Sequence, residues 1–246
     1  MTIAVLSDIH GNLAALDGVL ADAAARGATR IVNLGDILSG PLDPVGTADR
    51  LMALGLETVR GNHERQLLEQ PRPAMNASDG VTADAIGDHH RAWLASLPVD
   101  LWLEADLYAC HGSPRSDLEF LIETLEPGTT RAATQDEVRE RVAGIDAALI
   151  LCGHSHVQRA LRLDDGRLVV NPGSVGLQAF SDGHPFPYAI AMGTPHARYA
   201  LVEREPSGEW QAELISVAYD WDGAAALAQG NGRPDWAIGL ATGRVA

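Results

Sequence analysis

The sequence has 246 residues, of which 46% are hydrophobic and 21% charged, and this composition argues against an intrinsically disordered chain. The formal net charge of −15 argues against a long nucleic acid as partner, because binding a phosphate backbone needs clustered Lys and Arg side chains. No apolar run approaches the roughly 20 residues of a membrane-spanning helix, so we expect no membrane partner.

The N-terminal part of the sequence alternates predicted strands and helices. Apolar runs predict strands over residues 3–6, 30–34 and 57–59. Apolar residues at helical spacing predict a helix over residues 13–24, with Gly27 as its stop signal. Asp43-Pro44 predicts the start of a second helix that runs to about residue 54. This βαβαβ order is typical of a largely parallel sheet with crossover helices.

The rest of the sequence mixes helices with short strands. Helices are predicted over residues 81–97 and 135–142, and strands over residues 101–103, 107–110, 147–151, 159–163, 168–170, 188–192, 199–202 and 213–218. The turn Asp164-Asp165-Gly166 predicts a hairpin, and the pattern from residue 158 onward is antiparallel. We therefore expect an α/β fold with two β-sheets packed face to face and helices outside.

We interpret residues 1–246 as a single domain. Residues from about 180 to 246 are expected to elaborate the second sheet. The segments 70–80 and 113–130 are rich in loop residues and could cover a site.

Nearly every strand predicted in the first 156 residues ends in side chains that bind metals. These ends are Asp8-Ile9-His10, Gly35-Asp36, Gly61-Asn62-His63-Glu64, Cys110-His111-Gly112 and Gly153-His154-Ser155-His156. Because the carboxyl ends of strands line the ligand crevice of an open α/β sheet, we expect these side chains to converge.

The residue types at these ends suit a site with hard or borderline cations. Residues i and i+2 of extended backbone point the same way, so Asp8 with His10, and His154 with His156, could each direct two groups to one place. Carboxylate, imidazole and amide ligands without thiolate favour Mn, Fe, Zn or similar ions. The two oxygens of Asp36 could bridge a pair of ions, and such a pair can clamp a phosphoryl displacement.

The ordered series D-x-H, G-D, G-N-H-[DE], H-G and G-H-x-H resembles the calcineurin-like metallophosphoesterase superfamily. The motifs span residues 8–156, and Asn171-Pro-Gly-Ser-Val-Gly176 extends the likeness to about residue 176. The sequence is similar to the small bacterial and archaeal phosphodiesterase-like branch, which is related to diadenosine tetraphosphatases. The resemblance implies a four-layer αββα sandwich of two mixed sheets. It also implies an enzyme that hydrolyses small phosphodiesters or nucleotide-like phosphoesters by attack of a metal-bound hydroxide.

The resemblance implies a role for each matching residue. One divalent ion would be held by Asp8, His10 and His156, the other by Asn62, His111 and His154, with Asp36 as the bridge. Mn is the first expectation for these ions, and Fe, Zn, Ni and Mg are alternatives. His63 would protonate the leaving group or stabilise the phosphoryl oxygens. Glu64 would accept a hydrogen bond from a metal-bound imidazole.

Several residues keep a second interpretation. Asn12 either orients substrate or caps the first helix, and Asn62 could be a cap instead of a ligand. Arg60 either contacts phosphate or forms a surface salt bridge. His63 could instead support a ligand. His89 and His90 fit no motif and are expected on an exposed helix face.

Two alternative functions are a phosphomonoesterase or protein phosphatase, and a non-catalytic scaffold with the same fold. The protein-phosphatase branch has Asp-Arg after its Gly-Asp motif, and the segment Gly35-Asp-Ile-Leu-Ser-Gly-Pro41 lacks it. A scaffold is free to lose ligands, whereas this set is complete.

The cysteine count bears on the compartment. Cys110 and Cys152 are too few for a disulfide framework and predict buried free thiols in a cytoplasmic protein. The start of the sequence lacks the basic segment of a signal peptide, which favours the same location.

Overall fold

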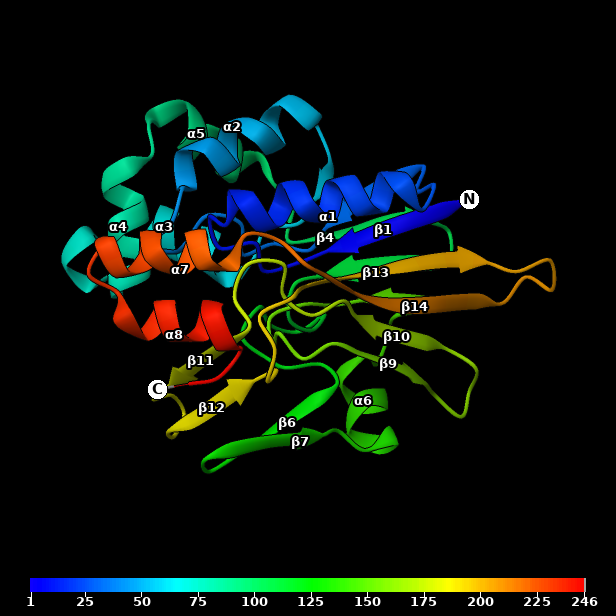
Figure 1. Cartoon of the computed structure of the whole chain (residues 1–246). Helices are drawn as coiled ribbons and strands as arrows, with labels where there is room; N and C mark the ends of the chain where they lie inside the picture. The colour runs from blue at the N-terminus through cyan, green and yellow to red at the C-terminus, as the bar shows by residue number, and fades with distance from the viewer. Residues whose placement is uncertain (246) are drawn as a thin grey trace.

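The computed structural model describes residues 1–245 and confirms the predicted pair of stacked β-sheets with helices outside (Figure 1). The first sheet, sheet A, contains in spatial order β14 (Trp210–Val217), β13 (Ala197–Arg204), β1 (Thr2–Leu6), β2 (Arg30–Asn33) and β3 (Glu57–Thr58). β1, β2 and β3 are parallel, whereas β13 runs antiparallel to both β1 and β14. Sheet A is therefore mixed.

The second sheet, sheet B, is also mixed. It contains in spatial order β4 (Asp100–Glu104), β5 (Leu107–Cys110), β8 (Leu149–Leu151), β10 (Leu168–Asn171) and β9 (Arg159–Arg162). The three central strands are parallel and the two edge strands antiparallel to them. β9 and β10 form the hairpin predicted at Asp164-Asp165-Gly166. Two smaller hairpins are β6 (Glu123–Glu126) with β7 (Thr129–Ala132), and β11 (Ala179–Asp182) with β12 (Tyr188–Ala191).

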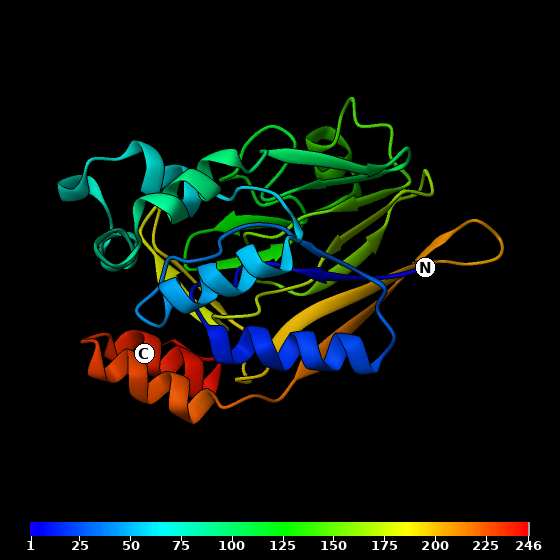
Figure 2. The same cartoon turned by 90° about the horizontal axis from the view of Figure 1, so that it is seen from above.

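Helices form the outer layers (Figures 1 and 2). α1 (Leu13–Ala25), α2 (Pro44–Leu54) and α5 (Asp88–Ser96) pack on sheet A, and α6 (Gln135–Arg141) packs on sheet B. Five further elements lie toward the end of the sandwich to which β1 points: α3 (Asn62–Glu69), a 3₁₀ turn (Arg72–Ala74), α4 (Ala77–Ala85), α7 (Trp221–Gly230) and α8 (Pro234–Thr242). The predicted αββα architecture is confirmed.

Alternation of side chains along β1 shows why the layers stack. Ile3 and Val5 belong to the core between the two sheets, whereas Ala4 and Leu6 belong to the core under α1. All four side chains are fully buried. Full burial of one Val, Leu or Ile side chain contributes about 1.5–3 kcal/mol to folding, so a one-residue register shift would lose several such terms.

Three predictions about individual elements are wrong in part. The helix predicted over residues 81–97 is divided into α4 and α5, because the chain is extended at Gly87, the N-cap of α5. The strands predicted over residues 199–202 and 213–218 extend sheet A instead of the second sheet, because β13 pairs with β1. His90 is buried instead of exposed, since its ring turns back to Asp49 of α2.

The helical segments are all limited in length or apolarity. Within residues 1–245, every helix is too short or too polar to cross a lipid bilayer.

Candidate metal centre

Two groups of potential metal ligands lie where the strands end. Asp8, His10 and His156 form the first group, and Asp36, His111 and His154 form the second. Within each group the potential ligand atoms lie within 4.8 Å of one another. The structure therefore brings together side chains from the ends of β1, β2, β5 and β8, as the sequence predicts.

The backbone at these positions has an unusual conformation. Among residues 1–245, the non-glycine residues with positive φ are Asp8, His10, Asp36, His154 and His156. Each conformation of this kind costs about 1–2 kcal/mol for an L-residue, so a run of them at one place points to a functional constraint.

Of the two pairs expected to share a target, Asp8 and His10 lie in one group as predicted, whereas His154 and His156 do not. The backbone here is left-handed and not extended, with φ of 65° at His154 and 58° at His156. The two rings separate as a result: His154 joins the second group and His156 the first.

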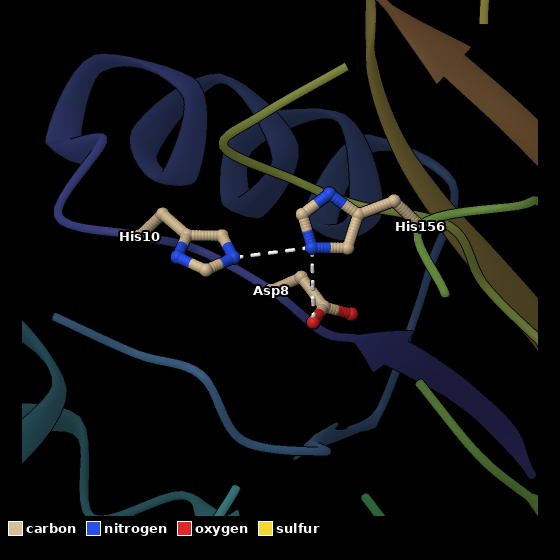
Figure 3. Close-up of side chains that lie close together, drawn as sticks. All are labelled: Asp8, His10 and His156. Atoms are coloured by element: carbon tan, nitrogen blue, oxygen red, sulfur yellow. Dashed lines mark hydrogen bonds and ion pairs between the residues drawn. The ribbon is translucent and has the colours of Figure 1, made fainter. Parts of the chain in front are cut away.

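The first group contains two imidazoles whose Nε2 atoms face each other at 3.1 Å (Figure 3). The Nδ1 atom of His10 donates to the carbonyl of Ser39, and that of His156 to the carbonyl of Leu177, both at 2.8 Å. Because Nδ1 carries the proton in each neutral ring, each Nε2 presents a lone pair. Two lone pairs at this distance repel each other, and a shared cation removes the repulsion.

Asp8 completes this group as an acceptor without a donor. Its Oδ1 lies 3.3 Å from His156 Nε2, and it is a buried oxygen with no hydrogen-bond partner. Burial and the nearby His156 lower the pKa of His10 to about 4, so the His10 ring is neutral at physiological pH. Neutral imidazoles and an unpaired buried carboxylate oxygen fit a divalent cation.

In the second group, too, a backbone carbonyl fixes the orientation of a histidine ring. His111 Nδ1 donates to the carbonyl of Leu34 at 2.8 Å, and its Nε2 lies 3.1 Å from both Asp36 Oδ2 and Asn62 Oδ1. Burial and the neighbouring His111 lower the pKa of His154 to about 4. Burial opposes a charge on His111 as well, but the Asp36 carboxylate raises its pKa to about 10. A cation that binds Nε2 of His111 therefore has to displace a proton.

Asp36 stands between the two groups. Burial disfavours its ionised form, but His111 and His63 hold the pKa of Asp36 well below its usual range. The same carboxylate favours the charged form of His10 in the first group and of His154 in the second, and so opposes the lowering of both pKa values. It is thus close enough to act on both.

Glu64 supports the backbone around Asp36. Its buried carboxylate accepts the backbone N–H groups of Asp36, Ile37 and Gly61 at 2.8, 2.8 and 2.9 Å. The prediction that Glu64 accepts from a metal-facing imidazole is wrong, because backbone carbonyls take the Nδ1 protons of His10, His111 and His156.

Two glycines let the chain segments approach this closely. A Cβ on Gly61 would lie 2.3 Å from Asp36 Oδ1, and one on Gly153 would lie 2.0 Å from Ser7 Oγ and 3.0 Å from Asp8 Oδ2. Any side chain at either position would push a candidate ligand away.

His63 pairs with an aspartate that the sequence analysis missed. His63 Nδ1 lies 2.6 Å from Oδ1 of Asp79, whose carboxylate is fully buried and also accepts from Asn76. Burial disfavours the cationic ring, yet Asp36 and Asp79 raise the pKa of His63 to about 9. Its ring centroid is 5.4 Å from that of His10. The sequence feature that could have indicated Asp79 is its position three residues after Asn76, the N-cap of α4, in a segment predicted only as loop-rich.

A cavity of about 540 Å³ opens over both groups. Its lining includes His10, Asp36, Asn62, His63, His154 and His156. Two predicted ligands, Asp8 and His111, lie deeper than this lining, and they contact it through His156 and Asn62.

The two predicted substrate-binding residues lie outside this lining. Asn12 caps α1, because its Oδ1 accepts the N–H of Ala15, and its amide donates to Gly176 and Tyr219. Arg60 lines a different, smaller cavity, which His111 also lines. The geometry thus favours the cap interpretation of Asn12 and does not bring Arg60 to the candidate centre.

A third group of potential ligands has a different character. His90 Nδ1 accepts the N–H of Gly87 at 3.2 Å, so its Nε2 carries the proton and donates to Asp49 at 2.9 Å. An N–H, and not a lone pair, faces this group. Asp49, His89 and His90 therefore form a contact between α2 and α5 and not a plausible metal site.

Comparison with known proteins adds the family to this geometry. A sequence model of the calcineurin-like phosphoesterase superfamily domain matches residues 1–192, most of the chain. The chain belongs to the calcineurin-like phosphoesterase superfamily. The resemblance predicted from the motifs is confirmed. The superfamily is metal-dependent, and the two groups supply candidate ligands in this member.

Individual relatives agree with this assignment. The chain is 26% identical over 247 residues to an uncharacterized protein of Methanocaldococcus jannaschii, covering 95% of this chain and 94% of the relative. A metallophosphoesterase from Sphaerobacter thermophilus is 25% identical, with a TM-score of 0.73 and 98% of each chain covered. A hypothetical protein from Pyrococcus horikoshii shares the fold, with 20% identity, a TM-score of 0.74, and 100% and 99% of the two chains covered. These full-length matches extend the calcineurin-like phosphoesterase fold to the segment beyond residue 192.

Proposed function

We propose that this calcineurin-like phosphoesterase hydrolyses small phosphodiesters or nucleotide-like phosphoesters at a dinuclear metal centre. Asp8, His10 and His156 would hold one divalent ion, and Asn62, His111 and His154 the other, with Asp36 between them. The observation that carries the proposal is the pair of inward-facing Nε2 lone pairs of His10 and His156, 3.1 Å apart beside the unpaired Asp8 carboxylate oxygen. A divalent cation between these atoms would pair with both lone pairs and with the carboxylate oxygen.

The donor set limits the choice of ions. Nitrogen and oxygen ligands without thiolate suit Mn best in our proposal, with Fe, Zn, Ni and Mg as alternatives. Two such ions supply activation of water at neutral pH and neutralise charge on the phosphoryl oxygens.

His63 would act as the proton donor to the leaving group. Burial disfavours the cationic ring, but Asp79 raises the pKa of His63 and fixes the ring orientation through Nδ1, which favours a proton on the ring. With Nδ1 bound to Asp79, the Nε2 proton of His63 is the one available to the departing oxygen.

The test is a panel of phosphoesters given to metal-stripped protein. Monoesters, diesters, cyclic nucleotides and dinucleoside polyphosphates are each assayed with Mn, Fe, Zn, Ni or Mg added back. We expect turnover only after a metal is added, with a stoichiometry of two ions per chain. A protein that binds no metal and turns over none of these esters would instead be a scaffold.

We also propose a cytoplasmic location, supported by the two buried free thiols of Cys110 and Cys152. Fractionation of the native cells tests this.

A further inference from the structure

The cavity over the candidate centre has an aromatic wall. Phe180 of β11 packs against His156 with ring centroids 4.7 Å apart, and Trp236 of α8 packs against His10 at 5.9 Å. Both line the cavity, together with Leu118, Leu125 and Pro185. Apolar surface thus stands directly beside the imidazoles of the first group.

The same cavity is poor in positive charge. Arg233 is the one Arg or Lys among its lining residues. That guanidinium is already engaged: Nε and Nη2 donate to Asp235 at 2.9 and 2.7 Å, and Nη1 donates to Ser78 Oγ at 2.9 Å. Asp182 adds a carboxylate to the lining. Apart from the proposed ions and the His63 ring, the described lining therefore offers no free Arg or Lys side chain to a second phosphate.

These two observations indicate how many phosphate groups the cavity can accommodate. A substrate with one phosphoryl group places its charge on the two proposed ions. Each further phosphate would enter a pocket with Asp182 and a neutralised Arg233, and would lose hydration without gaining an Arg or Lys donor. An aromatic or apolar substituent would instead gain contact with Phe180 and Trp236.

We propose that the cavity selects phosphoesters with a single phosphoryl group and an aromatic or apolar substituent, and discriminates against polyphosphates. This inference rests on the proposed function. It names the substrate class as aryl or nucleoside phosphodiesters and monophosphate esters, and it makes Phe180 a specificity residue.

Binding of non-hydrolysable phosphonates tests the aromatic wall independently of catalysis. Phenylphosphonate and methylphosphonate are titrated into Mn²⁺-loaded protein by isothermal calorimetry. We expect phenylphosphonate to bind at least tenfold more tightly. Phe180→Leu keeps an apolar side chain but removes the ring, and should cancel most of this preference. Leu214→Ala, a change at an exposed position of β14 outside the lining, is the matched control and should keep the preference.

Turnover at a fixed free metal concentration tests the charge argument. The nitrophenyl ester of thymidine 5′-phosphate should give a kcat/KM at least tenfold above that of the γ-nitrophenyl ester of thymidine 5′-triphosphate, a polyphosphate with the same leaving group. Equal affinity for the two phosphonates, or a preference for the polyphosphate, overturns this inference while leaving hydrolysis intact. A phenyl preference in binding without turnover of any ester would sustain the aromatic wall and refute the proposed function.

Discussion

Asp8, His10, Asp36, His154 and His156 share a left-handed backbone that L-residues avoid. At the residue scale this conformation aims their side chains inward at a strand end, where ordinary extended backbone would send neighbours to opposite faces. The surrounding hydrogen bonds hold it in place. Asp8 N–H donates to Gly35, His10 N–H to Asp36 and Gly176 N–H to Asp8, at 2.9, 3.0 and 2.9 Å. Part of the folding free energy is thus committed to ligand geometry.

Substitutions at His156 should reveal this strain. His156→Gly is expected to be more stable than His156→Ala by about 1 kcal/mol, because glycine adopts a left-handed backbone without a Cβ clash. Urea unfolding of the metal-stripped variants measures the difference. The control pair is His89→Gly and His89→Ala in helix α5, where alanine should be the more stable by a similar amount. The same order of stability at both positions would show that His156 is unstrained.

Substitution of Asp36 should affect both proposed metal sites. Asp36→Asn removes one negative charge from between the two groups, so we expect loss of activity and lower occupancy of both ions. Metal content after dialysis, measured by mass spectrometry, checks this. Asp49→Asn is the matched control, and because Asp49 faces an N–H of His90 it should leave metal content unchanged. Full turnover by Asp36→Asn would remove Asp36 from the centre.

At the scale of elements, two short helices build the proposed proton donor. α3 carries His63 in its first turn, directly after the strand end that supplies Asn62, and α4 carries Asp79. α3 and α4 pack together and bring these two residues within 2.6 Å although they are 16 positions apart in sequence. The pair depends on helix packing and not on any one loop.

Variants of this pair should separate chemistry from metal binding. His63→Ala should keep both ions but lose about 100-fold or more in kcat for alkyl leaving groups, and much less for nitrophenol, which departs without a proton. Asp79→Asn alone should lower kcat by part of this factor. In a chain that already carries His63→Ala it should lower kcat little further, because Asp79 acts through His63. An equal loss for both leaving groups would count against the donor role, and loss of metal would make His63 a ligand.

The sequence predicts these elements unequally. The strand ends of β1, β2, β3, β5 and β8 are visible because each places motif residues after a short apolar run. Asp79 was not predicted, because its partner is set by packing of α3 on α4 and not by spacing. Phe180 and Trp236 were missed for a similar reason: they reach the centre only through β11 and α8, which lie outside the recognised motifs. The left-handed backbone at His154 and His156 left no trace in residue type, so the expectation of a shared target was wrong.

At the scale of the whole molecule, the residue range that contains the candidate ligands is shorter than the range needed to complete sheet A. The family model ends at residue 192, after all candidate ligands. β13 lies beyond that limit, yet it sits between β1 and β14, and its Ala200 and Val202 are fully buried in the core between the sheets. Sheet A therefore needs sequence that supplies no ligand.

Truncated chains should show which residues beyond the candidate ligands the fold requires. A chain that ends after residue 192 is expected to lose cooperative unfolding, because β1 would lose one of its two partner strands and the core contacts of β13. A chain that ends after residue 218 keeps β13 and β14 and lacks α7 and α8. It should unfold cooperatively at a lower Tm and bind phenylphosphonate more weakly, since Trp236 is gone. Calorimetry and circular dichroism measure both, and cooperative unfolding of the shorter chain would refute the structural need for β13.

The pairing of β1 with β13 also sets the order of events on a ribosome. Thr2 pairs with Glu203, so the first strand to emerge waits for one of the last. At roughly 5–20 residues per second, about 10–40 seconds of translation separate the two strands. Throughout that interval one hydrogen-bonding edge of β1 is open to other chains, which makes the nascent protein a candidate client of chaperones that shield strand edges.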